Sequence, residues 1–290
     1  MITLTMAILS SSVIFVIFKL FERFKVDVFQ AIVFNYFTAF ILGVGLYGHE
    51  WNPVVMQHSG WMLYAAISAM LFISLFFLMG KSAQRNGVAL TSTAVKMSMA
   101  MSMLLMIVCY GEQVSLLKVF GILMAFLGVY LVSFNKEGSA SEQGAHWMLI
   151  VLFVGSGLLD FLLNFVQKSM LGVLTPSLFS AVGLGLAGLM GSVILLWNTL
   201  RGRTRFAWKN LLAGVILGIP NYFSIYLLIS AYRDTGWSDS TVLAVNNVSV
   251  VVLSALTGFL LFKESAGWKK VSGLVFSVAA IIVLYFAGIG

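Results

Sequence analysis

The sequence predicts an all-α integral membrane protein with ten transmembrane helices. The chain is 60% hydrophobic and only 9% charged, whereas a soluble domain carries about a quarter charged residues. Its 290 residues contain ten apolar runs, each long enough to cross roughly 30 Å of hydrocarbon as a helix. These runs form two sets of five with related sequences, which indicates an internal repeat. Lipid is therefore the expected solvent.

The predicted helices follow one another through short connections. The longest connections cover 48–60, 135–145 and 199–208, so no soluble domain or nucleotide-binding loop fits between the helices. The first run has no A-x-A-like cleavage site, and we expect it to be retained as a span. In order, the predicted spans are 2–21, 28–47, 61–82, 88–108, 116–134, 146–166, 177–198, 209–232, 240–262 and 268–287.

The last helix of each set shows the repeat most clearly. Small residues recur there at helical spacing, and such faces let backbones approach closely in lipid, either within the chain or between two copies in a homodimer. We expect one repeat over residues 1–138 and the other over 139–290; chance similarity between apolar segments is the alternative. The aligned pairs are Glu112 with Glu264, Lys118 with Lys270, Val119 with Val271, Gly121 with Gly273, Ala125 with Ser277 and Gly128 with Ala280.

Two tandem repeats of five helices enter the membrane in opposite orientations, because five is an odd number. The basic residues support this arrangement: they lie in or beside alternate connections, not in a stripe that would bind nucleic acid. The exceptions among the 17 Lys and Arg residues are Lys96, Lys118, Lys168 and Arg233. The positive-inside rule places the basic face in the cytoplasm and both termini outside, in a multi-pass protein of the inner cell membrane.

This pattern resembles the EamA-type transporters of the drug/metabolite transporter (DMT) superfamily over nearly the whole chain. The resemblance implies the DMT fold of two inverted five-helix repeats, with a central cavity lined by the first, third and fourth helices of each. Family members often carry a proline in the fourth and ninth helices, and this chain has none there. The residues that carry the resemblance are the turn from Ala83 to Gly87, the pairs Gly111-Glu112 and Lys263-Glu264, and the following Gly121 and Gly273.

Two ionisable residues lie inside predicted spans. Lys96 stands roughly 12 Å from one end of its span, at 1.5 Å per residue, and Asp160 lies in the opposite half of the chain. A charge at this depth costs several kcal/mol unless it faces water or a partner. Lys96 and Asp160 therefore either bind ligand groups or protons, or form an ion pair that only fixes the helices. Glu112 and Glu264 stand at helix boundaries, and we expect each to complement the positive end of the helix that follows it.

Polar side chains on three further spans are candidates for the same cavity. Asn164 extends a stripe that begins at Ser156 and passes through Asp160, and such a stripe faces a neighbouring helix or a wet cavity. Asn246 and Asn247 stand near Lys96 in the repeat alignment. They offer donors and acceptors to a polar solute, or they form a bond between helices.

Pro220 interrupts the eighth span near its centre. A kink there turns Asn221, Tyr222 and Tyr226 toward the interior, where the rings can stack on an apolar part of a ligand. Packing of the two tyrosines with satisfied hydroxyls is the alternative. Methionines at alternate positions of the fourth span wrap around the helix, and we expect most of them to fill space between helices.

The predicted function is secondary active transport of a small organic metabolite by alternating access. We expect an amino acid-like or other amphipathic solute, moved with a coupling proton or ion or by exchange. The alternatives are a non-transporting scaffold or receptor and an intramembrane enzyme. His49, His58 and His146 lie in or beside connections, and no H-E-x-x-H or G-x-S-x-G pattern occurs. We therefore expect no catalytic residue, no metal site and no cofactor.

Overall fold

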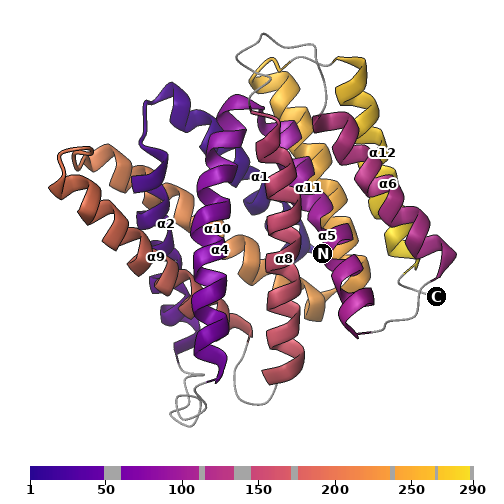
Figure 1. Ribbon diagram of the computed structural model, residues 1–290, viewed down its shortest axis with the longest axis horizontal. Helices are drawn as coiled ribbons and strands as arrows, with labels where there is room; N and C mark the ends of the chain where they lie inside the picture. The colour runs from indigo at the N-terminus through magenta and orange to yellow at the C-terminus, as the bar shows by residue number, and fades with distance from the viewer. Residues whose placement is uncertain are drawn as a thin grey trace. The chain divides into compact units, whose positions relative to one another are not determined.

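The computed structural model describes residues 1–48, 60–110, 115–133, 145–170, 176–235, 239–264 and 267–287 (Figure 1). In these ranges the chain forms ten α-helices and no strand. The helices are α1 (Ile2–Arg23), α2 (Val28–Tyr47), α4 (Gly60–Arg85), α5 (Val88–Tyr110), α6 (Leu116–Ser133), α8 (Trp147–Met170), α9 (Pro176–Leu200), α10 (Trp208–Asp234), α11 (Asp239–Leu261) and α12 (Trp268–Ala287).

Each predicted span corresponds to one of these helices, with ends that agree to within about one turn. Local signals explain some of the ends. The Asp27 carboxylate accepts a hydrogen bond of 2.9 Å from the Gln30 amide and caps the start of α2, as acidic and hydroxyl side chains do at helix N-termini. The all-α prediction is therefore confirmed for the described part of the chain.

The distribution of polarity identifies the solvent of these helices. Large apolar side chains such as Leu116 (91% exposed) and Val193 (70%) point outward, whereas Asn35 and Ser82 are fully buried. Only lipid accommodates a surface of this kind, because the helices satisfy their own backbone groups. By length and composition six described helices can cross a membrane. The shorter apolar stretches of the other four cover Leu116–Leu131, Trp147–Leu163, Val245–Leu261 and Val271–Phe286.

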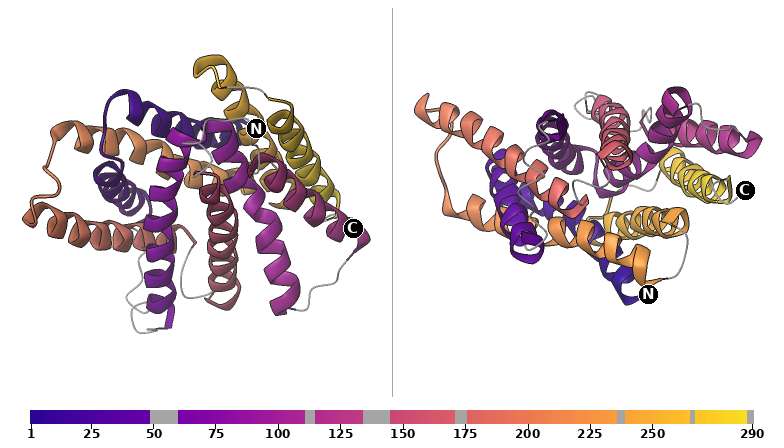
Figure 2. Two further views of the ribbon diagram at one scale, coloured as in Figure 1. Left: turned by 45° about the horizontal axis from the view of Figure 1, so that its top comes forward. Right: turned by 90° about the horizontal axis from the view of Figure 1, so that it is seen from below.

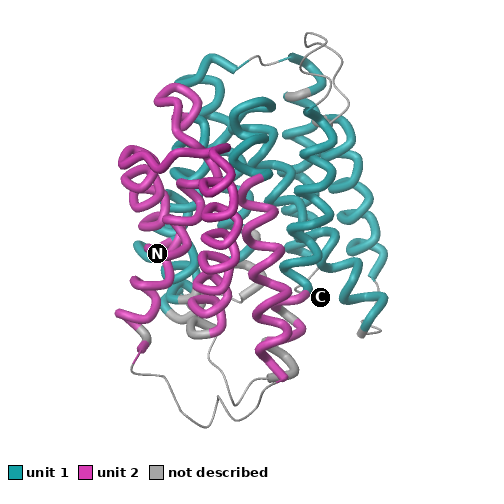
Figure 3. The backbone as a smooth tube through the Cα atoms, turned by 60° about the vertical axis from the view of Figure 1, so that its left-hand side comes forward, with its two compact units in different colours: residues 1–19, 78–161, 224–290 teal, residues 20–77, 162–223 magenta. Residues whose placement is uncertain are grey.

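Contacts divide the chain into two compact units (Figure 3). Each unit takes residues from both predicted repeats, and α1, α4, α8 and α10 each pass from one unit into the other. This division by contact differs from a division by repeat, so the boundary at residue 138 stays a prediction. Unit 1 comprises Met1–Lys19, Leu78–Phe161 and Ser224–Gly290, and unit 2 comprises Leu20–Phe77 and Leu162–Phe223.

In unit 1, α6 and α12 form the most extensive pair of described helices (Figures 1 and 2). A Cβ atom at Gly128 would lie 2.6 Å from Ser277 Oγ and 3.1 Å from Ser277 N, so the absence of a side chain lets the two backbones meet. Ala125 and Ala280 are fully buried in the same core. The small faces predicted from the sequence thus pack against each other within the chain, which we call the α6–α12 seam.

The start of α5 is capped from the far end of the chain. Val88 N donates a hydrogen bond of 2.7 Å to Glu264 Oε1, and Ala89 N donates one of 3.4 Å to Oε2. The carboxylate therefore complements the positive end of α5. We expected Glu264 to cap the helix that follows it, α12. This expectation was wrong, because Glu264 caps α5. Glu112, its repeat equivalent, lies outside the described residues.

The end of α11 aims this carboxylate at α5. Lys263 adopts a left-handed conformation with φ of 52°, and Glu264 N then donates a hydrogen bond of 3.0 Å to Gly258 O. Such a turn satisfies the last carbonyl groups of a helix. Space for the carboxylate comes from two glycines, because a Cβ atom would approach it to 2.5 Å at Gly87 and to 2.6 Å at Gly258. Gly87 also has a φ of 92°, which favours glycine.

In unit 2, buried amides join the starts of α2 and α10. Asn210 Nδ2 donates to Gln30 Oε1 at 2.9 Å, and Gln30 Nε2 donates to Arg205 O at the same distance. Asn210 Oδ1 in turn accepts from Asp27 N at 3.0 Å. Farther along α10, a Cβ atom at Gly214 would lie 2.5 Å from Ala31 O. This unit is therefore held by close helix contact and by paired amides.

Candidate functional site

The middle of α5 carries the first part of the candidate site in unit 1. Lys96 is half-buried there, and Ser98 is buried. Ser98 Oγ lies 2.6 Å from Val95 O and 3.0 Å from Asp160 Oδ2 on α8, and it donates its single proton to one of these acceptors. Ser98 thus connects the fourth predicted span to the sixth. Sequence reasoning did not single out this serine, although it stands two residues from Lys96.

A glycine explains why Asp160 reaches α5. A Cβ atom at Gly157 would lie 2.6 Å from Met101 Cβ and 2.9 Å from Ser98 O. Without it, the backbone of α8 comes close to α5, and Asp160 follows almost one turn later on the same helix. Small residues serve this purpose at helix contacts in membranes. The sequence stripe from Ser156 to Asp160 therefore meets a neighbouring helix.

Lys96 and Asp160 interact electrostatically, each influencing the charge of the other. The hydrogen-bond partner of the Asp160 carboxylate is Ser98, rather than Lys96. Asp160 is also exposed although it stands well inside α8. A carboxylate at such a depth is tolerated where it meets water or a partner. The two residues that the sequence singled out are thus close enough to influence each other.

The contact of α5 with α11 contains two buried amides of α11. Asn247 Nδ2 donates to Met99 Sδ at 3.6 Å, and Asn246 Nδ2 donates to Asn247 Oδ1 at 3.4 Å. Both contacts are long. Asn246 is only 1% exposed, yet its Oδ1 accepts no hydrogen bond from any described residue. A buried acceptor of this kind costs about 1–3 kcal/mol unless a donor such as water or a ligand reaches it.

Three of the predicted site residues belong to α10. In unit 2, Asn221 Nδ2 donates to Asn35 Oδ1 of α2 at 3.1 Å, so it joins two helices. Tyr222 is buried, and a Cβ atom at Gly43 would lie 3.1 Å from its ring. Tyr226 is half-buried and falls in unit 1. The helix continues through Pro220. The predicted ligand role of these three residues stays a prediction.

The remaining predictions concern residues of other kinds. The side chain of Asn164 lies outside the described residues, although α8 includes its backbone. Met97 and Met99 are buried in the core of unit 1, and Met101 and Met103 pack against it, as expected of filling residues. In the described ranges no three His, Cys, Asp or Glu residues gather as metal ligands would.

The fold and the site indicate the class of protein. The chain is a multi-pass helical membrane protein that carries charged and amide side chains away from its helix ends. Residues 1–134 match the model of the EamA-like transporter family. This match connects the N-terminal part of the chain, residues 1–134, with the drug/metabolite transporter superfamily that the resemblance implied.

Two similar proteins cover nearly the whole chain. A Haemophilus influenzae protein described as uncharacterized is 28% identical over 290 residues, which cover 98% of this chain and 97% of that protein. A crystal structure, described only as that of a protein, matches with a TM-score of 0.62 at 15% identity. It covers 99% of this chain and 96% of its own. The fold therefore extends over both halves.

Proposed function

We propose that the protein is a secondary transporter that moves a small amphipathic metabolite across the inner cell membrane by alternating access. The superfamily is one of transporters, and the polar group of α5, α8 and α11 supplies a ligand site of the right chemistry. The observation that carries the proposal is the Asp160 carboxylate, hydrogen-bonded to Ser98 and near Lys96, at a depth where an isolated charge is unstable.

Two inverted five-helix repeats are part of this proposal. The two contact units support it, because their borders cut the first and sixth helices at Lys19 and Phe161 and the third and eighth at Phe77 and Phe223. Corresponding helices are thus divided in the same way. Asn247 also stands as far from the start of α11 as Lys96 does from the start of α5. In an inverted pair, both residues lie at a similar depth from opposite faces.

The site favours a solute with an anionic group and a hydrogen-bond donor. Lys96 attracts the anionic group, and the unfilled acceptor Asn246 Oδ1 receives the donor. Asp160 binds a cationic group or a coupling proton, and Ser98 Oγ lies 3.0 Å from its carboxylate. An amino acid-like compound has all of these groups. Asn247 positions the site through Met99, which belongs to the same helix as Lys96.

The test is solute flux in liposomes that contain only this protein. A thermal-shift screen of the purified chain against metabolites supplies candidates, and counterflow then measures exchange of each one. We expect Lys96→Ala and Asp160→Asn to lose at least tenfold in uptake while the protein still folds. Lys118→Ala serves as the control, since this residue stands at the start of α6, away from the candidate site.

Three outcomes would contradict the proposal. If both variants keep the uptake and the pH response of the wild type, the assigned roles are wrong. If a ligand from the screen binds tightly but no flux occurs, the protein is a receptor or scaffold. Conversion of a solute into a product in sealed liposomes would instead indicate an intramembrane enzyme.

A further inference from the structure

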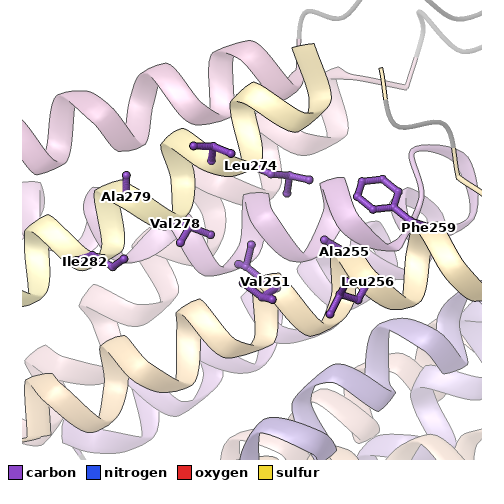
Figure 4. Close-up of a pocket in the computed structure, with 10 residues that line it drawn as sticks. Val251, Ala255, Leu256, Phe259, Leu274, Val278, Ala279 and Ile282 are labelled. Carbon is purple, nitrogen blue, oxygen red and sulfur yellow. The ribbon is translucent and has the colours of Figure 1, made fainter. Parts of the chain in front are cut away.

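An apolar groove runs between α11 and α12 in unit 1 (Figure 4). Its volume is about 380 Å³, and ten apolar side chains line it. Val251, Ala255 and Leu274 are buried and form its floor. Leu256 and Val275 are 48% and 62% exposed and form its rims. The groove is therefore open to the surroundings of the protein along its length.

The groove is long enough to hold most of a lipid tail that crosses one leaflet. Its lining extends from Val251 to Phe259 on α11 and from Leu274 to Ile282 on α12, which is about 12 Å on each helix at 1.5 Å per residue. One leaflet of the hydrocarbon core is about 15 Å thick, half of the full core. Phe259 and Ile282 lie at opposite ends of the groove (Figure 4). This shape fits an extended acyl chain along the helices.

The Phe259 end of the groove lies next to positive charge. Lys263 follows Phe259 by about one turn, and Lys269 precedes Leu274 in the first turn of α12. Both lysines are exposed, and neither forms an ion pair with a residue that the structure describes. Trp268, 81% exposed, stands beside them, as tryptophans do at the level of lipid headgroups.

The nearest carboxylate in the sequence does not neutralise these lysines. Glu264 follows Lys263 directly, but both of its oxygens accept hydrogen bonds from the first amides of α5. The cap described above therefore separates the charges of the α11–α12 connection. Lys263 and Lys269 remain at the entrance to the groove, whereas the Glu264 carboxylate binds the start of α5.

We propose that this groove binds one anionic phospholipid. An acyl chain occupies the space between α11 and α12, and the phosphate of the headgroup lies between Lys263 and Lys269. Basic pockets between membrane helices bind such headgroups on the cytoplasmic side, where anionic lipids gather. The apolar floor supplies affinity for the chain, and the two ammonium groups supply the preference for negative charge.

A second groove in the same unit is a natural control. It lies between α6 and α8, has a volume of about 450 Å³ and is lined by Phe126, Tyr130, Phe153 and other apolar residues. The sequence that joins these helices has one lysine, Lys136, against two acidic residues, Glu137 and Glu142. We expect this groove to accept lipid chains without preference for anionic headgroups.

Native mass spectrometry of the delipidated full chain tests the proposal. Phosphatidylglycerol and phosphatidylcholine with the same acyl chains are added separately, and the first bound lipid is quantified. We expect tighter binding of phosphatidylglycerol, and a loss of about fivefold for each lysine removed in Lys263→Gln/Lys269→Gln. The control Lys25→Gln/Arg203→Gln also removes two exposed positive charges, both in unit 2, and should bind like the wild type.

A second pair of variants tests the groove itself and does not depend on the lysines. Ala279→Phe fills the α11–α12 groove, and Val154→Phe fills the α6–α8 groove. We expect only Ala279→Phe to abolish the preference for phosphatidylglycerol. Circular dichroism confirms that each variant folds.

Three results overturn the proposal. The first is equal affinity for phosphatidylglycerol and phosphatidylcholine in the wild type. The second is binding of glycerol phosphate, which has no acyl chain, as tight as that of the whole lipid. The third is a lipid-free dimer of the wild type that Ala279→Phe separates, because a second copy of the chain then occupies the groove.

Discussion

Two regions of unit 1, the α6–α12 seam and the surroundings of the middle of α5, differ in the polarity and the tightness of their helix contacts. At the α6–α12 seam, Gly128 lets backbone meet backbone, and its neighbours Ala125 and Ala280 are apolar and fully buried. Around the middle of α5, by contrast, the contacts with α8 and α11 pass through Ser98 and Met99, and the hydrogen bonds are few and partly long.

The comparison assigns different roles to the two regions: the seam stabilises the fold, and the polar residues around α5 serve transport. A seam of small residues gains van der Waals contact and has one good arrangement, since interiors are densely packed. A buried acceptor such as Asn246 Oδ1 adds no hydrogen-bond energy to the fold until a donor from water or a ligand reaches it. We therefore expect substitutions at the seam to change the free energy of unfolding, and those around α5 to change transport.

Gly128→Val should have the largest effect on stability. The new side chain meets Ser277 N, 3.1 Å from the position of Cβ, and the backbone there cannot move aside. Overpacking of this kind costs about 1–3 kcal/mol. The melting temperature in detergent measures it. Gly45→Val is the matched control, because no atom lies within 4 Å of a Cβ at Gly45. A Gly128 variant as stable as this control would contradict the importance of the seam.

Glu264→Gln should destabilise the protein by a smaller amount, about 1–2 kcal/mol, because a neutral amide caps α5 less well than a carboxylate. Hydrogen exchange at the amides of Val88 and Ala89 locates the effect. The cost of Gly87→Ala should fall when Glu264 is also replaced by alanine, because the collision with the carboxylate is then removed. Additive costs of the two changes would show that they do not share one site.

Asn221→Leu should cost less again, about 0.6 kcal/mol, the mean for hydrogen bonds between helices in membranes. It removes the bond to Asn35 and leaves that buried amide without this partner. The melting temperature measures the loss. If Asn221 binds substrate, uptake falls far more than this small change in stability explains.

Asn246→Leu should change stability little, because it removes an Oδ1 atom with no hydrogen-bond partner among the described residues and one long hydrogen bond, of 3.4 Å, to Asn247. Uptake should nevertheless fall, with a rise in KM as the first sign, because the solute loses an acceptor. An unaltered KM together with lower stability would assign Asn246 to packing, like the residues of the seam.

The sequence alone predicted the helices and some of their contacts. Apolar runs determine where helices lie, and the small faces of α6 and α12 follow from spacing. The proximity of Lys96 and Asp160 could be predicted because an isolated charge inside the lipid is energetically costly. The partner of Glu264 could not be predicted, because Val88 lies 176 residues away and only the turn at Lys263 aims the carboxylate. Ser98 was missed because serines are common in membrane helices.

The cap on α5 also has a consequence for biosynthesis. The ribosome delivers the first half of the chain, including Val88 and Ala89, long before Glu264 is made. Until then the first turn of α5 exposes unpaired amides, which water or lipid headgroups must satisfy at the membrane surface. The nascent N-terminal half is thus incomplete at one defined point, and the arrival of a single late carboxylate completes it.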